Sequence, residues 1–298
     1  MLITPCFSSL GCPDATIEQL CAIATRPENR LEGSPACVEI RSLEGTADYP
    51  ARLAESPHAL RHAAAAVKEA GVEVRLIGSS FHLTGHTSAN FATTLLGAGR
   101  VADALGARYV RVFGGGSGGK PMTDEQIRHS AALYCEAVRY YESEGVAAEI
   151  IVETHGSFVT SELVQQMCDE AGQAIPLLWD THHTWKIGGE DPVETFDVLL
   201  PLIRHMHGKD SVALPADVLS SNPYRYVYPG EGEFPIAELF SAMAEATQDA
   251  GTASAIPTVA FSLEWELMWH RELPPLEPAL QSWLRVLQPY MQATAAAS

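Results

Sequence analysis

The sequence has few basic residues and no long hydrophobic segment. Its 298 residues include 19 lysines and arginines against 37 aspartates and glutamates, which gives a formal net charge of −18 at pH 7. Binding to a nucleic-acid backbone needs clustered positive charge, so we expect no nucleic-acid partner. No apolar run approaches the roughly 18 residues of a membrane-spanning helix, so we expect no membrane association.

The cysteines also lack a pattern. Six are present, and none of them forms the CxxC pair that would suggest a zinc or redox site. Residues 1–5 have neither the basic segment nor the long apolar segment of a secretory signal. We therefore expect free thiols and a cytoplasmic protein, because disulfides are rare in reducing compartments.

Strand-like and helix-like segments alternate along the whole chain. Short apolar segments typical of buried strands are each followed by a longer segment with helical character. Helix-ending glycines and a capping box at residues 123–126 mark several boundaries. The predicted strands are 2–8, 37–41, 72–80 and 109–113, with four more ending near 153, 180, 207 and 264. The predicted helices are 16–24, 57–70, 87–105, 123–145, 161–171, one opening at 191, 235–250 and 276–291.

Eight such units predict an α/β protein, a single (β/α)8 TIM barrel that spans residues 1–298 as one domain. Regular alternation implies a parallel sheet, and a barrel typically needs about 250 residues. An open, doubly wound sheet is the alternative architecture. We favour the barrel because the polar residues that follow the last four strands converge on one mouth when the sheet is closed.

Four of the apolar strands end in a side chain that can bind a metal. Glu153, Asp180 and His207 are spaced 27 residues apart, and Glu264 follows 57 residues later. Burying an unpaired carboxylate costs several kcal/mol, and three carboxylates at one barrel mouth would repel one another. One divalent cation resolves both problems, so we predict a metal site. The oxygen-rich donor set favours Mn²⁺, with Mg²⁺, Co²⁺ and Zn²⁺ left open.

For two of these positions, a nearby residue is an alternative candidate for the metal ligand. His205 shares a strand face with His207, because alternate side chains of a strand point the same way. We prefer His207, which lies nearer the strand end, and expect His205 to support it or to pack in the core. Glu266 stands in the same relation to Glu264 and is the second choice there, since Glu264 directly ends the apolar run.

Further polar residues near the strand ends are candidates for substrate contact. His183 follows Asp180 closely enough to hydrogen-bond a substrate oxygen, and His155 either orients Glu153 or touches substrate. His82 ends the third strand and is a candidate to line the mouth.

A long insertion at residues 211–233 follows the seventh strand. It carries several aromatic residues and Arg225, a composition that suggests a substrate lid. Arg225 is our candidate to hold a polar or anionic substrate group. The scarcity of lysine and arginine near the mouth nevertheless favours an uncharged substrate.

Residues 114–119 match a glycine-rich dinucleotide-binding pattern and, with Lys120, almost match a P-loop. Pro121 stands where a P-loop requires serine or threonine to hold Mg²⁺. The next helix also begins several residues too late. We interpret the segment as a flexible loop at the barrel mouth rather than a nucleotide site.

These motifs resemble those of the xylose isomerase-like TIM-barrel proteins, in the sugar phosphate isomerase/epimerase group. The matching segments are Glu-Thr-His at 153–155, Asp-x-x-His at 180–183, His-x-x-Asp at 207–210, Pro-Gly-Glu-Gly at 229–232 and Leu-Glu-Trp-Glu at 263–266. The resemblance covers essentially the whole chain, although Thr154 replaces the asparagine common in the first motif. It implies that Glu153, Asp180, His207 and Glu264 bind one divalent metal and that the two glutamates form an acid/base pair.

The resemblance implies a metal-dependent isomerase or epimerase of a small sugar or polyhydroxy carbonyl compound, acting through an enediolate. A dehydratase of the inosose dehydratase type and a non-catalytic sugar-binding barrel stay open as alternatives. The related apurinic endonucleases need extra histidine ligands, and Phe113 occupies one plausible position for such a ligand. We expect a small sugar-like molecule as the partner and leave a homodimer open.

Overall fold

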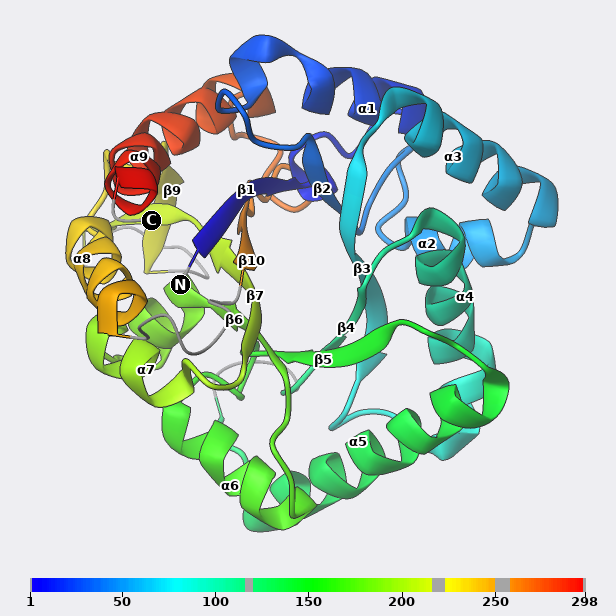
Figure 1. Ribbon diagram of the computed structural model, residues 1–298. Helices are drawn as coiled ribbons and strands as arrows, with labels where there is room; N and C mark the ends of the chain where they lie inside the picture. Colours follow the sequence, from blue (N-terminus) through cyan, green and yellow to red (C-terminus); the bar gives the residue numbers. More distant parts are fainter. Residues whose placement is uncertain (1, 116–119, 216–222, 250–257, 297–298) are drawn as a thin grey trace.

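Parallel strands close into a barrel with the helices arranged around it (Figure 1). The computed structural model describes residues 2–115, 120–215, 223–249 and 258–296. The barrel strands are β1 (Leu2–Ser8), β2 (Cys37–Ile40), β3 (Glu73–His82), β4 (Tyr109–Phe113), β5 (Glu149–Glu153), β6 (Leu177–Asp180), β7 (Ile203–Gly208) and β10 (Thr258–Leu263). Their order around the barrel is β1-β10-β7-β6-β5-β4-β3-β2, which confirms the predicted (β/α)8 fold.

The helices lie outside the strands, as predicted. They are α1 (Ile17–Thr25), α2 (Tyr49–Ala54), α3 (Pro57–Ala70), α4 (Leu96–Leu105), α5 (Asp124–Glu144), α6 (Ser161–Ala171), α7 (Pro192–Leu199), α8 (Ile236–Asp249) and α9 (Leu276–Ala296). Among the described residues, none of these helices has the length and apolarity needed to span a membrane.

The predicted helix at 87–105 is regular only in its second half. It opens with a 3₁₀ turn at Ser88–Asn90 and a π-helical segment at Phe91–Leu95 before α4 begins. The hydroxyl of Thr93 donates to the carbonyl of Asn90 at 3.3 Å. Such bonds between a side chain and the nearby backbone compete with regular helix geometry, and this one lies within the irregular segment.

A layer of apolar side chains inside the barrel supports the functional face. Its members come from four neighbouring strands and form one buried cluster, namely Leu76, Tyr109, Ile151 and Leu178. Alternate residues of a strand point to the same side, so the inward positions two residues further on are Gly78, Arg111, Glu153 and Asp180. The apolar layer thus forms the floor beneath a polar layer at the carboxyl ends of the strands.

The glycines at the end of β4 allow two chain segments to pack closely. A Cβ atom on Gly114 would overlap the ring of Phe158, and one on Gly115 would lie 2.5 Å from the backbone nitrogen of Phe158. Glycine is therefore required at both positions for contact with the segment after β5. The remainder of the glycine run, residues 116–119, lies outside the described residues.

The insertion after β7 begins as a two-stranded antiparallel hairpin, β8 (Asp210–Ala213) and β9 (Tyr224–Val227). Asp210 anchors the segment that follows β9. Its carboxylate accepts hydrogen bonds from the backbone N–H groups of Gly230, Gly232 and Phe234 at 2.9, 2.9 and 3.1 Å. The aspartate of the His-x-x-Asp motif and the glycines of Pro-Gly-Glu-Gly thus form one structural unit beside the barrel mouth.

Candidate metal centre

The barrel brings the four predicted metal ligands together. Glu153, Asp180 and His207 end or nearly end β5, β6 and β7, and Glu264 directly follows β10. One ligand atom from each lies within 4.8 Å of those of the other three. The Nδ1 atom of His207 is 3.6 Å from a Glu153 oxygen, 3.9 Å from an Asp180 oxygen and 3.3 Å from a Glu264 oxygen.

The donor atoms of this cluster suit a divalent cation. All four residues are buried, with 6% exposure or less. Glu153 Oε2 and Asp180 Oδ2 each lie 2.9 Å from a buried cation, Arg111 and Lys209 respectively, whereas Nδ1 of His207 is buried and makes no hydrogen bond. Buried polar atoms in proteins are nearly always satisfied, and a cation between these four side chains would satisfy this nitrogen. A set of three carboxylates and one imidazole fits Mn²⁺ and also accommodates Zn²⁺.

The surroundings keep two of the carboxylates in the ionised form that a metal requires. Burial alone would raise the pKa of Glu153, but the charges of Arg111 and His207 outweigh burial and hold that pKa near 2. The charges of His207 and Lys209 likewise outweigh burial at Glu264 and hold its pKa well below the ordinary value. The same carboxylates raise the pKa of His207, and a cation bound at Nδ1 would take the place of its proton. Burial raises the pKa of Asp180, and a cation in the cluster would oppose that rise.

Glu39 on β2 orients the histidine ligand, and the sequence did not reveal it. Its Oε2 atom lies 2.9 Å from Nε2 of His207 and 2.9 Å from Nε2 of His205. With Nε2 engaged by this carboxylate, Nδ1 of His207 is left to face the other ligands. A carboxylate behind a metal-binding histidine is a common device for fixing the ring and raising its basicity. His205, expected to support His207 or to pack in the core, is fully buried, and its Nε2 contacts the same Glu39 oxygen.

We expect the Glu39→Gln variant to bind Mn²⁺ about 10- to 100-fold more weakly than the wild type, the usual cost of losing an outer-shell partner. The amide keeps the size of the side chain but removes the charge that orients His207. Isothermal titration with Mn²⁺ measures the change. Glu32→Gln, at an exposed position, is the matched control and should bind like the wild type. Equal affinities in the two variants would show that Glu39 does not support the metal site.

Lys209 is a buried cation beside the cluster that was also not predicted. Its ammonium group lies 2.9 Å from Asp180 Oδ2 and 2.7 Å from Glu266 Oε1, and it also contacts Glu264. Burial disfavours the charged lysine, but these carboxylates outweigh it and raise the pKa of Lys209 well above the ordinary value. Glu266, the second choice as ligand, is instead paired with Lys209 and with the hydroxyl of Tyr226 at 2.9 Å.

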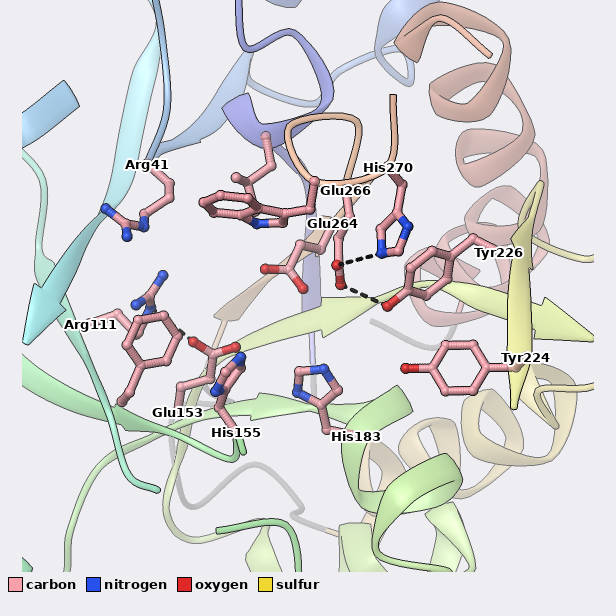
Figure 2. A pocket seen from close by; sticks show the side chains of 13 residues that line it. Arg41, Arg111, Glu153, His155, His183, Tyr224, Tyr226, Glu264, Glu266 and His270 are labelled. Carbon is pink, nitrogen blue, oxygen red and sulfur yellow. Dashed lines mark hydrogen bonds and ion pairs between the residues drawn. The ribbon is translucent and has the colours of Figure 1, made fainter. Parts of the chain in front are cut away.

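A cavity of about 180 Å³ opens over the cluster (Figure 2). Its lining comprises Leu10, Arg41, Arg111, Phe113, Glu153, His155, His183, Tyr224, Tyr226, Glu264, Glu266, Trp269 and His270. Two predicted substrate contacts, His155 and His183, are among these residues, with ring centroids 5.0 Å apart. Burial lowers the pKa of His155 to about 4, so this imidazole is neutral at physiological pH.

The structure does not bring the other two predicted substrate contacts into the cavity. His82 is half-buried and stacks on Phe113 at 4.4 Å between ring centroids, behind the cavity wall. Arg225 is exposed, because the alternation of β9 turns Tyr224 and Tyr226 inward in its place.

The premise that basic residues are scarce at the mouth is wrong. Arg41 and Arg111 line the cavity and Lys209 is buried beside it. The expectation of an uncharged substrate therefore loses its support.

Comparison with known proteins agrees with the barrel fold. The sequence matches the family of xylose isomerase-like TIM barrels over residues 36–272. A search of curated proteins gives no significant match.

Several solved structures share the fold at low sequence identity. The probable 3-DHS dehydratase AsbF from Bacillus anthracis is 19% identical over 96% of this chain and 98% of its own, with a TM-score of 0.66. The IOLI protein with a binding zinc atom is 17% identical over 97% and 98% of the two chains, with a TM-score of 0.66. A D-tagatose 3-epimerase-like protein is 14% identical over 99% of both chains, with a TM-score of 0.68.

Proposed function

This chain belongs to the family of xylose isomerase-like TIM barrels, and from that premise we propose that it is a metal-dependent isomerase or epimerase of small polyhydroxy carbonyl compounds. The observation that carries the proposal is the buried cluster of Glu153, Asp180, His207 and Glu264 beneath a small cavity. We propose Mn²⁺ as the resident ion, with Zn²⁺ as the alternative because one structural neighbour contains zinc.

Glu153 and Glu264 carry the proton transfers in this proposal. They come from different strands and reach into the cavity from different directions (Figure 2). One carboxylate removes the proton from the carbon beside the substrate carbonyl. The other carboxylate, after accepting a proton from water, returns it to the opposite face of that carbon, or to the neighbouring carbon. When bound, the divalent cation supplies Lewis-acid stabilisation of the negative charge that develops on the substrate oxygens.

His155 and His183 position the substrate in this proposal. The Nδ1 atom of His183 lies 3.1 Å from Asp180 Oδ2 and 3.2 Å from the carbonyl of Thr154, which fixes the ring at the cavity edge. The neutral ring of His155 offers both a donor and an acceptor. Two imidazoles at this spacing suit the adjacent hydroxyl groups of a sugar-like molecule.

A dehydratase is the second candidate. It is favoured by the structural likeness to a probable 3-DHS dehydratase, and it needs the same first step. After a carboxylate removes the proton, a hydroxyl group on the next carbon takes a proton from the carboxylic acid that has formed and leaves as water, so that no proton is returned to carbon. The two reactions differ in the mass of the product, since only the dehydratase product has lost water.

Proton NMR and mass spectrometry in D₂O test the proposal. The Mn²⁺-loaded protein is incubated with ketoses, inososes and hydroxypyruvate in separate reactions. An isomerase or epimerase incorporates solvent deuterium at the carbon beside the carbonyl and forms an isomer of the substrate. A dehydratase gives a product lighter by one water. Binding of these compounds without deuterium incorporation or product would contradict catalysis and support the sugar-binding alternative.

A further inference from the structure

Two buried arginines stand together at one side of the cavity. Arg41 follows β2 and Arg111 lies in β4, and their side chains are only 10% and 4% exposed. Figure 2 shows both guanidinium groups on the side of the cavity away from Tyr224 and Tyr226, with the Arg111 group next to Glu153. Arginine is almost never buried without a partner, so these two require an explanation.

The contacts within the protein use only part of each guanidinium group. Arg111 donates from Nη1 to the carbonyl of Ser79 at 2.8 Å, and its Nε faces Glu153 Oε2 at 2.9 Å. Arg41 donates from Nη2 to the hydroxyl of Ser80 at 2.8 Å. Each guanidinium group carries five N–H bonds, so both groups have donors beyond those used here, and both residues line the cavity.

The two positive charges of Arg41 and Arg111 are not fully matched by buried negative charge nearby. Glu153 is the buried carboxylate that pairs with Arg111. Asp48 lies 3.4 Å from Nη1 of Arg41, but it is 30% exposed, and this buried nitrogen makes no hydrogen bond. Burial and the nearby charge of Arg111 lower the pKa of Arg41 to about 10, so the group still carries its charge at neutral pH. One positive charge therefore lacks a close, buried counterpart.

Gly78 on β3 provides the space in which both side chains fit. A Cβ atom at this position would lie 2.9 Å from Cδ of Arg41 and 3.0 Å from Nη2 of Arg111. Any side chain here would push the two arginines aside. This side of the cavity is thus formed by β3, β4 and the end of β2. The inward position on β3 is a glycine, whereas the neighbouring inward positions carry large polar side chains.

We propose that Arg41 and Arg111 bind a carboxylate group of the substrate, so that the compound converted is a sugar acid or keto acid. This inference rests on the proposed function and names its substrate class. A carboxylate is planar, accepts paired N–H donors from guanidinium groups, and brings one negative charge to the one positive charge left without a buried partner. A phosphate ester would bring about two charges at pH 7 and fits this balance less well.

Binding to the Mn²⁺-loaded protein tests the inference without requiring turnover. Three compounds share one core and differ at one end, namely dihydroxyacetone, hydroxypyruvate and dihydroxyacetone phosphate. Isothermal titration should show that hydroxypyruvate binds at least about tenfold more tightly than dihydroxyacetone, because hydrogen bonds between charged groups are stronger than those between neutral groups. It should also bind more tightly than dihydroxyacetone phosphate. Tighter binding of the phosphate ester would overturn the assignment to a carboxylate.

The Arg41→Gln variant separates binding by the arginines from binding by the metal. It should lose about tenfold or more in affinity for hydroxypyruvate while its affinities for dihydroxyacetone and Mn²⁺ stay the same. Arg41→Lys keeps the charge and should retain part of the preference. Arg108→Gln removes an exposed arginine at the other end of β4 and should behave as the wild type.

Two outcomes would overturn the inference and leave the proposed function standing. One is equal binding of hydroxypyruvate and dihydroxyacetone by the wild type, which requires no variant to fold. The other is an Arg41→Gln protein that folds, as judged by circular dichroism, and keeps the full preference for hydroxypyruvate. Conversely, specific carboxylate binding without deuterium exchange would support the inference and contradict the enzymatic proposal.

Discussion

The Glu264→Gln variant is expected to lose about 10²- to 10⁴-fold in the rate of deuterium exchange into substrate, the usual contribution of a positioned acid or base. Glutamine has nearly the size and shape of glutamate, and its amide oxygen still reaches the cluster. It can neither accept nor return a proton at the pH of the assay. The variant should therefore bind Mn²⁺, more weakly than the wild type, and still fail to exchange when saturated with the ion.

The control for this experiment is Glu272→Gln, at a side chain that is 76% exposed. It should exchange deuterium at the wild-type rate, which would show that the loss is specific to the cavity. Metal content, measured on the same samples, separates lost chemistry from lost metal. Wild-type exchange in a Glu264→Gln protein would contradict the acid/base role of Glu264 and move that role to another residue.

The His207→Ala variant is expected to bind Mn²⁺ at least about 100-fold more weakly, because even an outer-shell partner of a ligand costs 10- to 100-fold. The substitution removes the single nitrogen donor, whose Nδ1 atom faces the other three ligands. It also leaves Glu39 and the ligand carboxylates with less positive charge around them. We therefore expect a lower melting temperature both with and without added Mn²⁺.

Thermal denaturation with and without Mn²⁺ measures the second effect. A ligand present at 100 times its dissociation constant stabilises the folded state by about 2.7 kcal/mol. The melting temperature of the wild type should therefore be higher with Mn²⁺ than without it, whereas that of His207→Ala should not change. His58→Ala, at an exposed histidine, is the matched control and should respond to Mn²⁺ like the wild type. If His207→Ala binds as many metal ions per chain as the wild type, His207 is not a metal ligand.

The sequence predicted the barrel and the four clustered residues because both depend on local patterns. A carboxylate or imidazole that ends an apolar strand is visible in one short segment, as at Glu153 and Asp180. The regular spacing of such segments indicates repeated strand–helix units, which place the strand ends at one mouth. Neither inference requires knowledge of which distant residues touch.

Glu39 and the arginine pair could not be predicted in the same way because their meaning depends on contacts across the barrel. Glu39 and His207 are far apart in sequence and meet only when the sheet closes. Arg41 follows β2 and Arg111 lies in β4, and only Gly78 on β3 between them makes room for both. The one local signal was a charged residue inside a short apolar strand, which also occurs at solvated positions.

The prediction for Arg225 depended on a register that the sequence does not specify. In the hairpin, Arg225 pairs with Val212 and Tyr226 pairs with Ser211. A shift of one residue would exchange the inward and outward side chains of β9. The observed register places Tyr224 and Tyr226 against the cavity and Arg225 in solvent. The composition of the insertion indicated residues that could reach substrate but did not indicate which of them do so.

The central claim is that Glu153, Asp180, His207 and Glu264 hold one divalent cation. Anomalous X-ray diffraction from crystals grown with Mn²⁺ tests it most directly. The predicted result is one strong peak between these four side chains, on the Nδ1 side of His207. The absence of a peak there, or a peak that lies instead between Glu39 and His205 on the opposite side of that ring, would contradict the account.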